Sequence, residues 1–169
     1  LGPDGVELTE EGSAEIASYR DCVIADSMFI DCREGLALAQ FRAQNYGEAR
    51  RHLLGGLTGR VLEIGAGTGA NFRYYPPHVQ VTAIEPSSHF FRRARMKVGQ
   101  ARATIELRQA DAQALPFGDD AFDAAVATLV FCTIADPAAA ACEVRRVLRP
   151  GGAFHFVEHV RAQSRWLGW

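Results

Sequence analysis

Residues 61–70 read VLEIGAGTGA, an apolar run that leads into a glycine-rich turn and then into a helical stretch. Glycines at positions 65, 67 and 69 let the backbone approach a ligand where a Cβ would collide with it. The spacing also fits the permissive dinucleotide pattern GxGxx(G/A). Taken alone, this segment predicts only that a nucleotide-like ligand binds at the end of the first strand.

Around this segment, short apolar runs alternate with helical stretches. We expect strands at residues 61–64, 79–84, 104–107, 122–127 and 153–157, and helices near residues 70–75, 88–98 and 137–148. In the last helix, Ala140, Val144, Val147 and Leu148 share one face, which is typical of a helix that packs on a core. Apolar strands separated by amphipathic helices predict an α/β fold with a doubly wound, mostly parallel sheet covered on both faces.

The residues before this pattern are predicted to form helices of their own. Helical spacing runs through residues 16–30 and again from about residue 34 to residue 53, and it ends at Gly55-Gly56. Glycine often follows a helix because it adopts positive φ. We therefore expect an N-terminal helical cap over residues 1–57 and a ligand-binding core over residues 58–169, together forming one domain.

The composition excludes several classes of protein. Hydrophobic residues make up 48% and charged residues 22% of the 169 residues, which excludes an intrinsically disordered chain. The formal net charge is −2, whereas nucleic-acid-binding domains are strongly basic, so we expect no nucleic-acid partner. The apolar stretch at residues 124–135 is too short for a membrane span, and no secretory signal opens the chain. We expect a cytoplasmic protein without a membrane span, whose four cysteines are reduced and mostly buried.

An acidic residue, Glu85, ends the second predicted strand, twenty residues after Gly65. A carboxylate at this position can accept hydrogen bonds from both hydroxyls of a ribose. The prediction holds equally for a nicotinamide cofactor and for S-adenosylmethionine, so these residues leave both cofactors open.

Downstream motifs distinguish the two cofactors. Asp111-Ala112 follows the third strand, Leu115-Pro116-Phe117 and the turn at residues 118–120 precede Phe122-Asp123, and residues 148–152 read LRPGG. Together with residues 63–69, these motifs resemble the class I S-adenosylmethionine-dependent methyltransferases over about residues 60–160. Within that superfamily, residues 69–72 (GANF), 75–77 (YPP), 145–154 (RRVLRPGGAF) and 158–160 (EHV) are similar to the methyltransferase-like 7 group of thiol methyltransferases and its bacterial relatives.

The resemblance implies a cofactor site at the carboxyl ends of the strands. Glu63 and the turn with Gly65, Ala66, Gly67, Gly69 and Asn71 would hold the methionine part, with Glu63 near its amino group. Glu85 would bind the ribose, and Pro86 would shape the adenine pocket. Asp111 would accept the adenine amine, with a backbone contact from Ala112, and Thr128, Leu129 and Phe131 would line the floor near the sulfonium. No metal is implied.

The expected reaction is a single in-line displacement that moves a methyl group to a small-molecule acceptor, with a thiol favoured and S-adenosylhomocysteine as the other product. The sulfonium methyl is already activated, so placement of the acceptor supplies most of the catalysis. His155, Glu158 and His159 are the candidate general bases, and His159, at the rim of the cleft, is the one we assign. His155 is expected to be a packed histidine, and a thiol acceptor can react without any histidine.

Two alternatives remain at this point. A nicotinamide-dependent oxidoreductase fits the glycine turn but not the downstream motifs. The other alternative is a protein that only binds the cofactor, or that serves as a non-catalytic partner subunit. It is suggested by the end of the sequence: the superfamily's sheet ends in an antiparallel hairpin, and the sequence leaves no room for that hairpin after Val160. We expect the hairpin to be missing from this chain, or a second copy or another chain to cover the open edge of the fifth strand.

Overall fold

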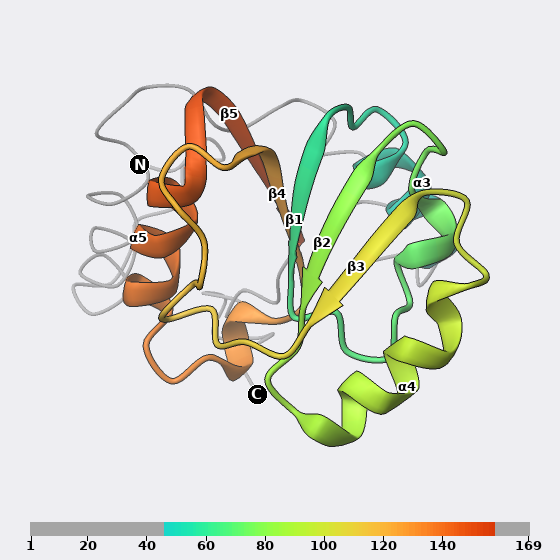
Figure 1. Ribbon diagram of the computed structural model, residues 1–169, viewed down its shortest axis with the longest axis horizontal. Coiled ribbons are helices and arrows are strands. Elements are labelled where there is room, and N and C mark those ends of the chain that lie inside the picture. Colours follow the sequence, from blue (N-terminus) through green and yellow to red (C-terminus); the bar gives the residue numbers. More distant parts are fainter. Residues whose placement is uncertain (1–45, 158–169) are drawn as a thin grey trace, which may run out of the picture.

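Parallel strands form the sheet of the computed structural model, which describes residues 46–157. The strand order is β3-β2-β1-β4-β5, and each neighbouring pair is parallel (Figure 1). The bounds are β1 Arg60–Ile64, β2 Gln80–Ile84, β3 Thr104–Arg108, β4 Phe122–Thr128 and β5 Leu148–Val157. The predicted α/β fold with a mostly parallel sheet is confirmed.

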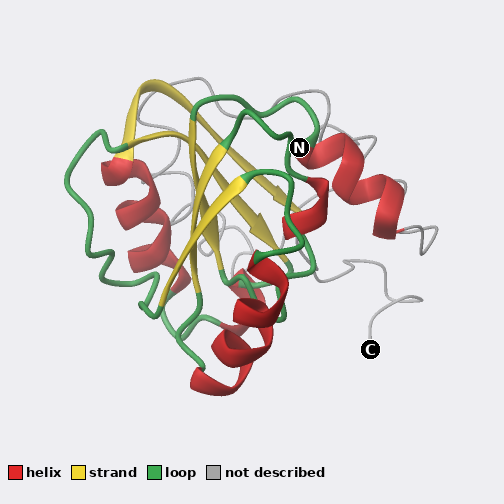
Figure 2. Ribbon diagram, turned by 45° about the vertical axis from the view of Figure 1, so that its right-hand side comes forward, coloured by secondary structure: helices red, strands yellow, loops and turns green. Residues whose placement is uncertain are grey.

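Helices cover both faces of this sheet, as Figures 1 and 2 show. The elements are α3 Tyr46–Leu54, α4 Ser88–Val98 and α5 Pro137–Val147, with short 3-10 turns η1 at Phe72–Tyr74 and η2 at Phe131–Thr133. Buried side chains of α3, η1 and α4 pack with Val61 and Val126 on one face of the sheet. Buried side chains of α5 pack with Leu62 and Ala125 on the other face. Alternate residues of β1 and β4 therefore contribute to separate cores, as the pleat requires.

The helix expected at residues 70–75 forms only as the 3-10 turn η1. Two prolines follow Tyr75, and a residue that precedes proline is driven from the helical into the extended region. Tyr75 accordingly has φ −67° and ψ 137°. The expected helix is therefore wrong in length, and the side chains of Asn71 and Tyr75 turn inward, where both are buried.

The strand expected at residues 153–157 begins earlier, directly at the end of α5. Leu148 already pairs with Phe122, and the register between β4 and β5 shifts before Ala124 pairs with Ala153. Within the described residues, β5 pairs with β4 alone.

The structure also bears on the predicted N-terminal cap, the cysteines and the membrane span. Of the expected N-terminal cap, the described residues include α3, whose Ala49, Leu53 and Leu54 are buried; the rest lies outside them. Cys132 is a free thiol but is exposed rather than buried. Cys142 is disulfide-bonded, so the expectation that all four cysteines are reduced is wrong for this residue. Among residues 46–157, no helix has the length and apolar character of a membrane span.

Arg146 on α5 fixes the loop that follows β3. Its guanidinium donates to the carbonyl oxygens of Leu115, at 3.1 Å, and Phe117, at 2.8 Å, and to the carboxylates of Asp119 and Glu143. Glu143 completes the connection by accepting from the backbone N–H of Leu115 at 2.7 Å. The planar fork of an arginine can make these contacts at once, so the loop is held against α5 at several points.

We expect Arg146→Lys to lower the free energy of unfolding by about 1–3 kcal/mol, because an ammonium cannot bind two carbonyls and two carboxylates together. Urea unfolding followed by circular dichroism measures this. Arg93→Lys is the matched control, since Arg93 is exposed on α4, and it should change stability by less than about 0.5 kcal/mol. Equal losses in both variants would contradict this role for Arg146.

Candidate functional site

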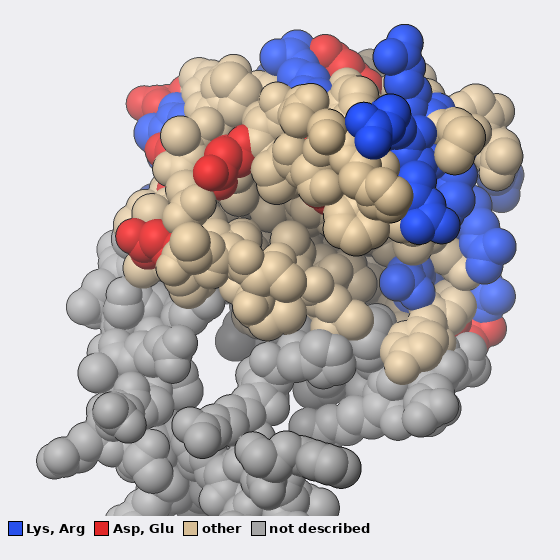
Figure 3. Space-filling view, turned by 90° about the horizontal axis from the view of Figure 1, so that it is seen from below, with Lys and Arg blue, Asp and Glu red and all other residues tan. Residues whose placement is uncertain are grey.

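A cavity of about 570 Å³ opens at the edge of the sheet where the carboxyl ends of the strands meet (Figure 3). This volume lies within the range of small-molecule sites, and parallel α/β sheets bind ligands at this edge. The structure brings eleven of the predicted site residues together in its lining: Glu63, Gly65, Ala66, Gly67, Asn71, Glu85, Pro86, Asp111, Ala112, Thr128 and Leu129.

Two predicted residues do not line the cavity, and one lies outside the described residues. Gly69 shapes the turn from behind, where its N–H donates to the carbonyl of Ala66 at 2.8 Å. Phe131 is buried in the core, with its ring centroid 5.7 Å from that of Phe154. His159, the assigned base, lies outside the described residues, as does Glu158. His155 is half-buried on β5 and does not line the cavity.

Several lining residues were not predicted from the sequence. They include Arg50 from α3, Phe90 from α4, Gln113 after β3, and Thr133 and Ile134 after β4. Arg50 carried no signal because it lies in a helix far from the glycine turn in sequence. Gln113 stands two residues after Asp111, and that spacing, which lets an aspartate accept from the backbone N–H two positions on, could have indicated it.

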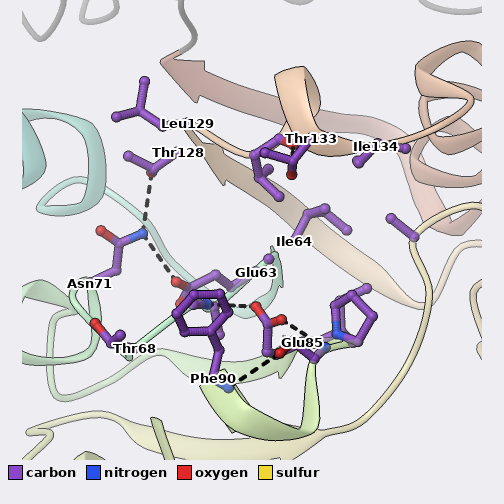
Figure 4. A pocket seen from close by; sticks show the side chains of 18 of the residues that line it. Glu63, Ile64, Thr68, Asn71, Glu85, Phe90, Thr128, Leu129, Thr133 and Ile134 are labelled. Carbon is purple, nitrogen blue, oxygen red and sulfur yellow. Dashed lines mark hydrogen bonds between the residues drawn. The ribbon is translucent and has the colours of Figure 1, made fainter. Parts of the chain in front are cut away.

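Glu63 is the buried polar centre of the site, with 2% of its surface exposed. The Tyr75 hydroxyl donates to its Oε2 at 2.9 Å, and the amide of Asn71 donates to its Oε1 at 3.1 Å. The same Asn71 amide donates to Thr128 Oγ1 at 3.2 Å, as Figure 4 shows. Arg50 Nε in turn donates to Asn71 Oδ1 at 2.8 Å. The carboxylate is thus held by a chain of contacts that reaches from β1 to α3.

Burial raises the pKa of Glu63 to about 7, although the hydrogen bonds from Tyr75 and Asn71 act in the opposite direction. Burial also raises the pKa of Tyr75, and the neighbouring Glu63 charge adds to that increase. The tyrosine therefore stays protonated as a donor, while Glu63 changes its charge near neutral pH. A cation placed beside Glu63 would favour its ionised form.

Glu85 is nearly buried, with 5% of its surface exposed, and both of its oxygens are held by backbone donors. Gly67 N–H donates to Oε2 at 2.8 Å, and Ser87 N–H donates to Oε1 at 2.9 Å. A carboxylate has about four acceptor positions, so each oxygen keeps one for a ligand. The side chain is therefore fixed in place with two acceptors available, which suits a pair of neighbouring hydroxyls.

The glycine turn leaves space next to this carboxylate. Gly67 has φ +55°, and a Cβ built on it would meet no atom closer than 4.0 Å, so the position beside the turn is open. At Gly65, with φ +66°, a Cβ would collide with Val130 Cγ2. Gly65 is therefore required by packing, whereas Gly67 leaves room at the cavity wall, where a ligand can approach the backbone.

The chain leaves β4 through a strained residue. Leu129 has φ 55°, which lies in the left-handed region that residues other than glycine rarely adopt. Its backbone N–H donates to the carbonyl of Val157 at 2.8 Å. Such a conformation costs about 1–3 kcal/mol and tends to occur at functional sites. In Figure 4, Thr128, Leu129, Thr133 and Ile134 lie on the side of the cavity opposite Glu85 and Phe90.

Asp111 is the third acidic side chain at the cavity, and it is exposed. The pKa of Asp111 lies below its ordinary value, chiefly because the backbone N–H of Gln113 donates to its carboxylate. Within the described lining, the ionisable side chains are three carboxylates and Arg50, without a histidine, cysteine or lysine. Such a site can bind hydroxyls, an amine and a cation.

Comparison with known proteins places these observations in a family. A family described as "Methyltransferase domain" matches residues 62–156, more than half of the chain. "Thiol S-methyltransferase TMT1A" of Homo sapiens is 41% identical over 110 residues, which make up 63% of this chain and 45% of that protein. "Phosphatidylethanolamine N-methyltransferase" of Cereibacter sphaeroides is 41% identical over 103 residues, which make up 60% and 51%. The chain thus spans about half the length of these relatives.

A solved structure shows the same fold. The S-adenosylmethionine dependent methyltransferase from Mesorhizobium loti has a TM-score of 0.55 and 29% sequence identity, and the match covers 64% of this chain and 51% of that one. The comparison supports the arrangement of strands around the cavity.

We expect the unfolding free energy of the native chain to fall by about 2–3 kcal/mol between pH 5 and pH 8 through Glu63 alone. The folded pKa is about 7 against an ordinary value of 4.5, so between about pH 5 and pH 7 the folded protein holds a proton that the unfolded chain has lost. Stability from this group is therefore present at low pH and decreases as pH rises through 7.

Glu63→Gln removes this dependence, since an amide of the same shape can accept from Asn71 and donate to the Tyr75 oxygen. Urea unfolding of both proteins at pH 5, 6, 7 and 8 measures the difference, in which other titrating groups cancel. A stability difference between the two proteins that does not change with pH would contradict a shifted pKa at Glu63.

Proposed function

The chain belongs to the methyltransferase domain family, and from that premise we propose that it binds S-adenosylmethionine in this cavity and transfers the methyl group to a small-molecule acceptor. The observation that carries the proposal is the order of the three carboxylates. Glu63 on β1, Glu85 after β2 and Asp111 after β3 follow one another along one cavity. The ammonium group, the ribose and the adenine amine of the cofactor follow one another in the same order.

The methionine end of the cofactor fits the Glu63 side of the cavity. Its ammonium group would lie near the Glu63 carboxylate, and the open wall at Gly67 allows the backbone to approach it. Arg50 lines the same cavity and uses Nε and Nη1 for Asn71 and Tyr46, so Nη2 remains for the cofactor carboxylate. The ammonium of the cofactor would thus pair with Glu63, and its carboxylate would pair with Arg50.

The nucleoside end fits the Glu85 side. The two acceptor positions left on Glu85 suit the ribose hydroxyls. Asp111 would accept the adenine amine, and Ala112 would contribute its backbone, as proposed from the sequence. Phe90 and Pro86 line this part of the cavity and supply apolar surface for the base.

When bound, the cofactor supplies a methyl group that is already activated by its positive sulfur. The chain's own residues hold that group and the acceptor in line, which lowers the barrier by about 7–11 kcal/mol in favourable cases. Thr128, Leu129, Thr133 and Ile134 lie across the cavity from Glu85, as Figure 4 shows, and we assign the acceptor to their side. This wall carries no charged side chain, so it suits an uncharged acceptor better than an ion.

We favour a thiol as the acceptor. A thiol has a pKa of about 8.5 and is partly ionised at neutral pH, so it needs little help from a base. An aliphatic amine, with a pKa of about 10, needs a base to expose its lone pair, and the described lining contains no histidine or lysine for that role. Sequence identity alone does not separate the two acceptors, because the chain is 41% identical both to a protein named thiol S-methyltransferase and to one named phosphatidylethanolamine N-methyltransferase.

Titration calorimetry of the chain with S-adenosylhomocysteine and with NADH tests the proposed cofactor. Binding of the first compound without the second supports the proposal. Binding of NADH alone would indicate the nicotinamide-dependent oxidoreductase, and binding of neither would indicate a partner or scaffold protein. A panel of thiols, quinones and phenols, assayed with cofactor that carries a labelled methyl group, then identifies the acceptor.

We predict that Glu85→Ala weakens S-adenosylhomocysteine binding by about 1–3 kcal/mol, because the ribose hydroxyls lose their acceptor and the turn loses its contact at Gly67. Glu106→Ala removes a carboxylate of the same size from exposed strand β3 and should leave the affinity unchanged. Calorimetry measures both. Equal affinities for the wild type and Glu85→Ala would remove this residue from the site.

The rate of thiol methylation should rise about tenfold per pH unit up to the pKa of the thiol used, and then level off. Several thiols of different pKa, each assayed at saturating cofactor between pH 6 and 10, distinguish this from base catalysis. The break in the profile should move with the thiol. A break at one fixed pH for all acceptors would show that a protein base takes the proton.

A further inference from the structure

Gln113 connects the acidic side chain after β3 to the start of α5. Its side-chain Nε2 donates to both oxygens of the Asp111 carboxylate, each at 3.1 Å, and its backbone N–H donates to Oδ1 at 2.9 Å. Its Oε1 accepts from the backbone N–H of Asp136 at 2.8 Å. Because a carboxylate only accepts and a backbone N–H only donates, this arrangement fixes which end of the amide points which way.

The Asp111 carboxylate depends on Gln113 for its orientation. In the part of the chain that the structure describes, its hydrogen bonds come from the side chain and the backbone of Gln113. The Asp111 side chain is exposed, so packing does not hold it. Without the Gln113 amide, the carboxylate would keep one backbone contact and could turn away from the cavity.

The other end of Gln113 is attached to a rigid part of the fold. Asp136 is the N-cap of α5, and its carboxylate accepts from the N–H of Ala139 at 2.9 Å. Ala140 and Val144 of the same helix are buried against the sheet. The Gln113 side chain therefore transmits the position of a packed helix to an exposed carboxylate at the cavity.

The hydrogen bonds from Gln113 leave one acceptor position of the Asp111 carboxylate free. Oδ1 accepts twice and Oδ2 accepts once, so Oδ2 retains one acceptor position. An amino group on a purine can donate to it. A purine with an oxo group at the same place would present an acceptor to an acceptor, which is unfavourable.

We propose that Gln113 is a positioning residue that holds the Asp111 carboxylate toward a purine amino group and so gives the site its preference for adenine over a 6-oxo purine. This inference rests on the proposed function, because it takes the bound nucleoside to be that of S-adenosylmethionine. It gives a role in base selectivity to a residue that need not touch the reacting atoms.

The test compares S-adenosylhomocysteine with S-inosylhomocysteine, whose purine has an oxo group in place of the 6-amino group and a proton on N1. Calorimetry gives both dissociation constants and their ratio for the wild type, Gln113→Ala and Gln113→Met. Methionine keeps the volume of the side chain without its hydrogen bonds, so it serves if the alanine variant fails to fold. Gln100→Ala, at an exposed glutamine after α4, is the matched control.

We expect both Gln113 variants to bind S-adenosylhomocysteine about 3- to 10-fold more weakly and S-inosylhomocysteine almost as well as the wild type does. The preference for adenine then falls by the same factor, while Gln100→Ala keeps it. A purely structural role would weaken both ligands equally, and an unchanged ratio would overturn the proposal. If the wild type binds neither ligand, the proposed function itself fails. If the wild type binds both ligands and the ratio of their dissociation constants is the same in the Gln113 variants, only the role of Gln113 fails.

Discussion

The parallel register of β1 with its two neighbours is the constraint on which the rest of the structure depends. Glu63 lies beside Ala83 of β2 on one side and Val126 of β4 on the other. All the strands run in one direction, so whatever follows each of them arrives at the same edge of the sheet. Residues far apart in sequence, such as Glu63 and Asp111, therefore line one cavity.

This constraint places a carboxylate where only 2% of its surface is exposed. Burial of an ionised group costs several kcal/mol unless other groups compensate, and Glu63 is compensated by Tyr75, Asn71 and, through Asn71, Arg50. The network is complete but still leaves the pKa of Glu63 near 7. A protein selected for stability alone would place an apolar residue here. A cationic ligand beside Glu63 would give the ionised carboxylate its missing partner, which explains why the site retains a costly group.

Much of this arrangement could be predicted from the sequence because it depends on local patterns. Apolar runs located the strands to within a few residues, except that β5 begins at Leu148 because α5 ends without a loop. Glu85 was predicted because it directly follows a strand, whereas Asp111, three residues after β3, was indicated by the resemblance to methyltransferases. Sequence patterns did not predict Arg50 or the bridging role of Gln113, since both depend on how helices pack on the sheet. The resemblance placed Phe131 in the site, but packing turns its ring into the core.

A crystal structure of the chain grown with saturating S-adenosylhomocysteine would test the central claim most directly. We expect electron density for that compound in the cavity, with its ribose hydroxyls on the Glu85 carboxylate and its amino-acid end beside Glu63. A cavity that stays empty under those conditions, or that the chain's own side chains fill, would contradict it.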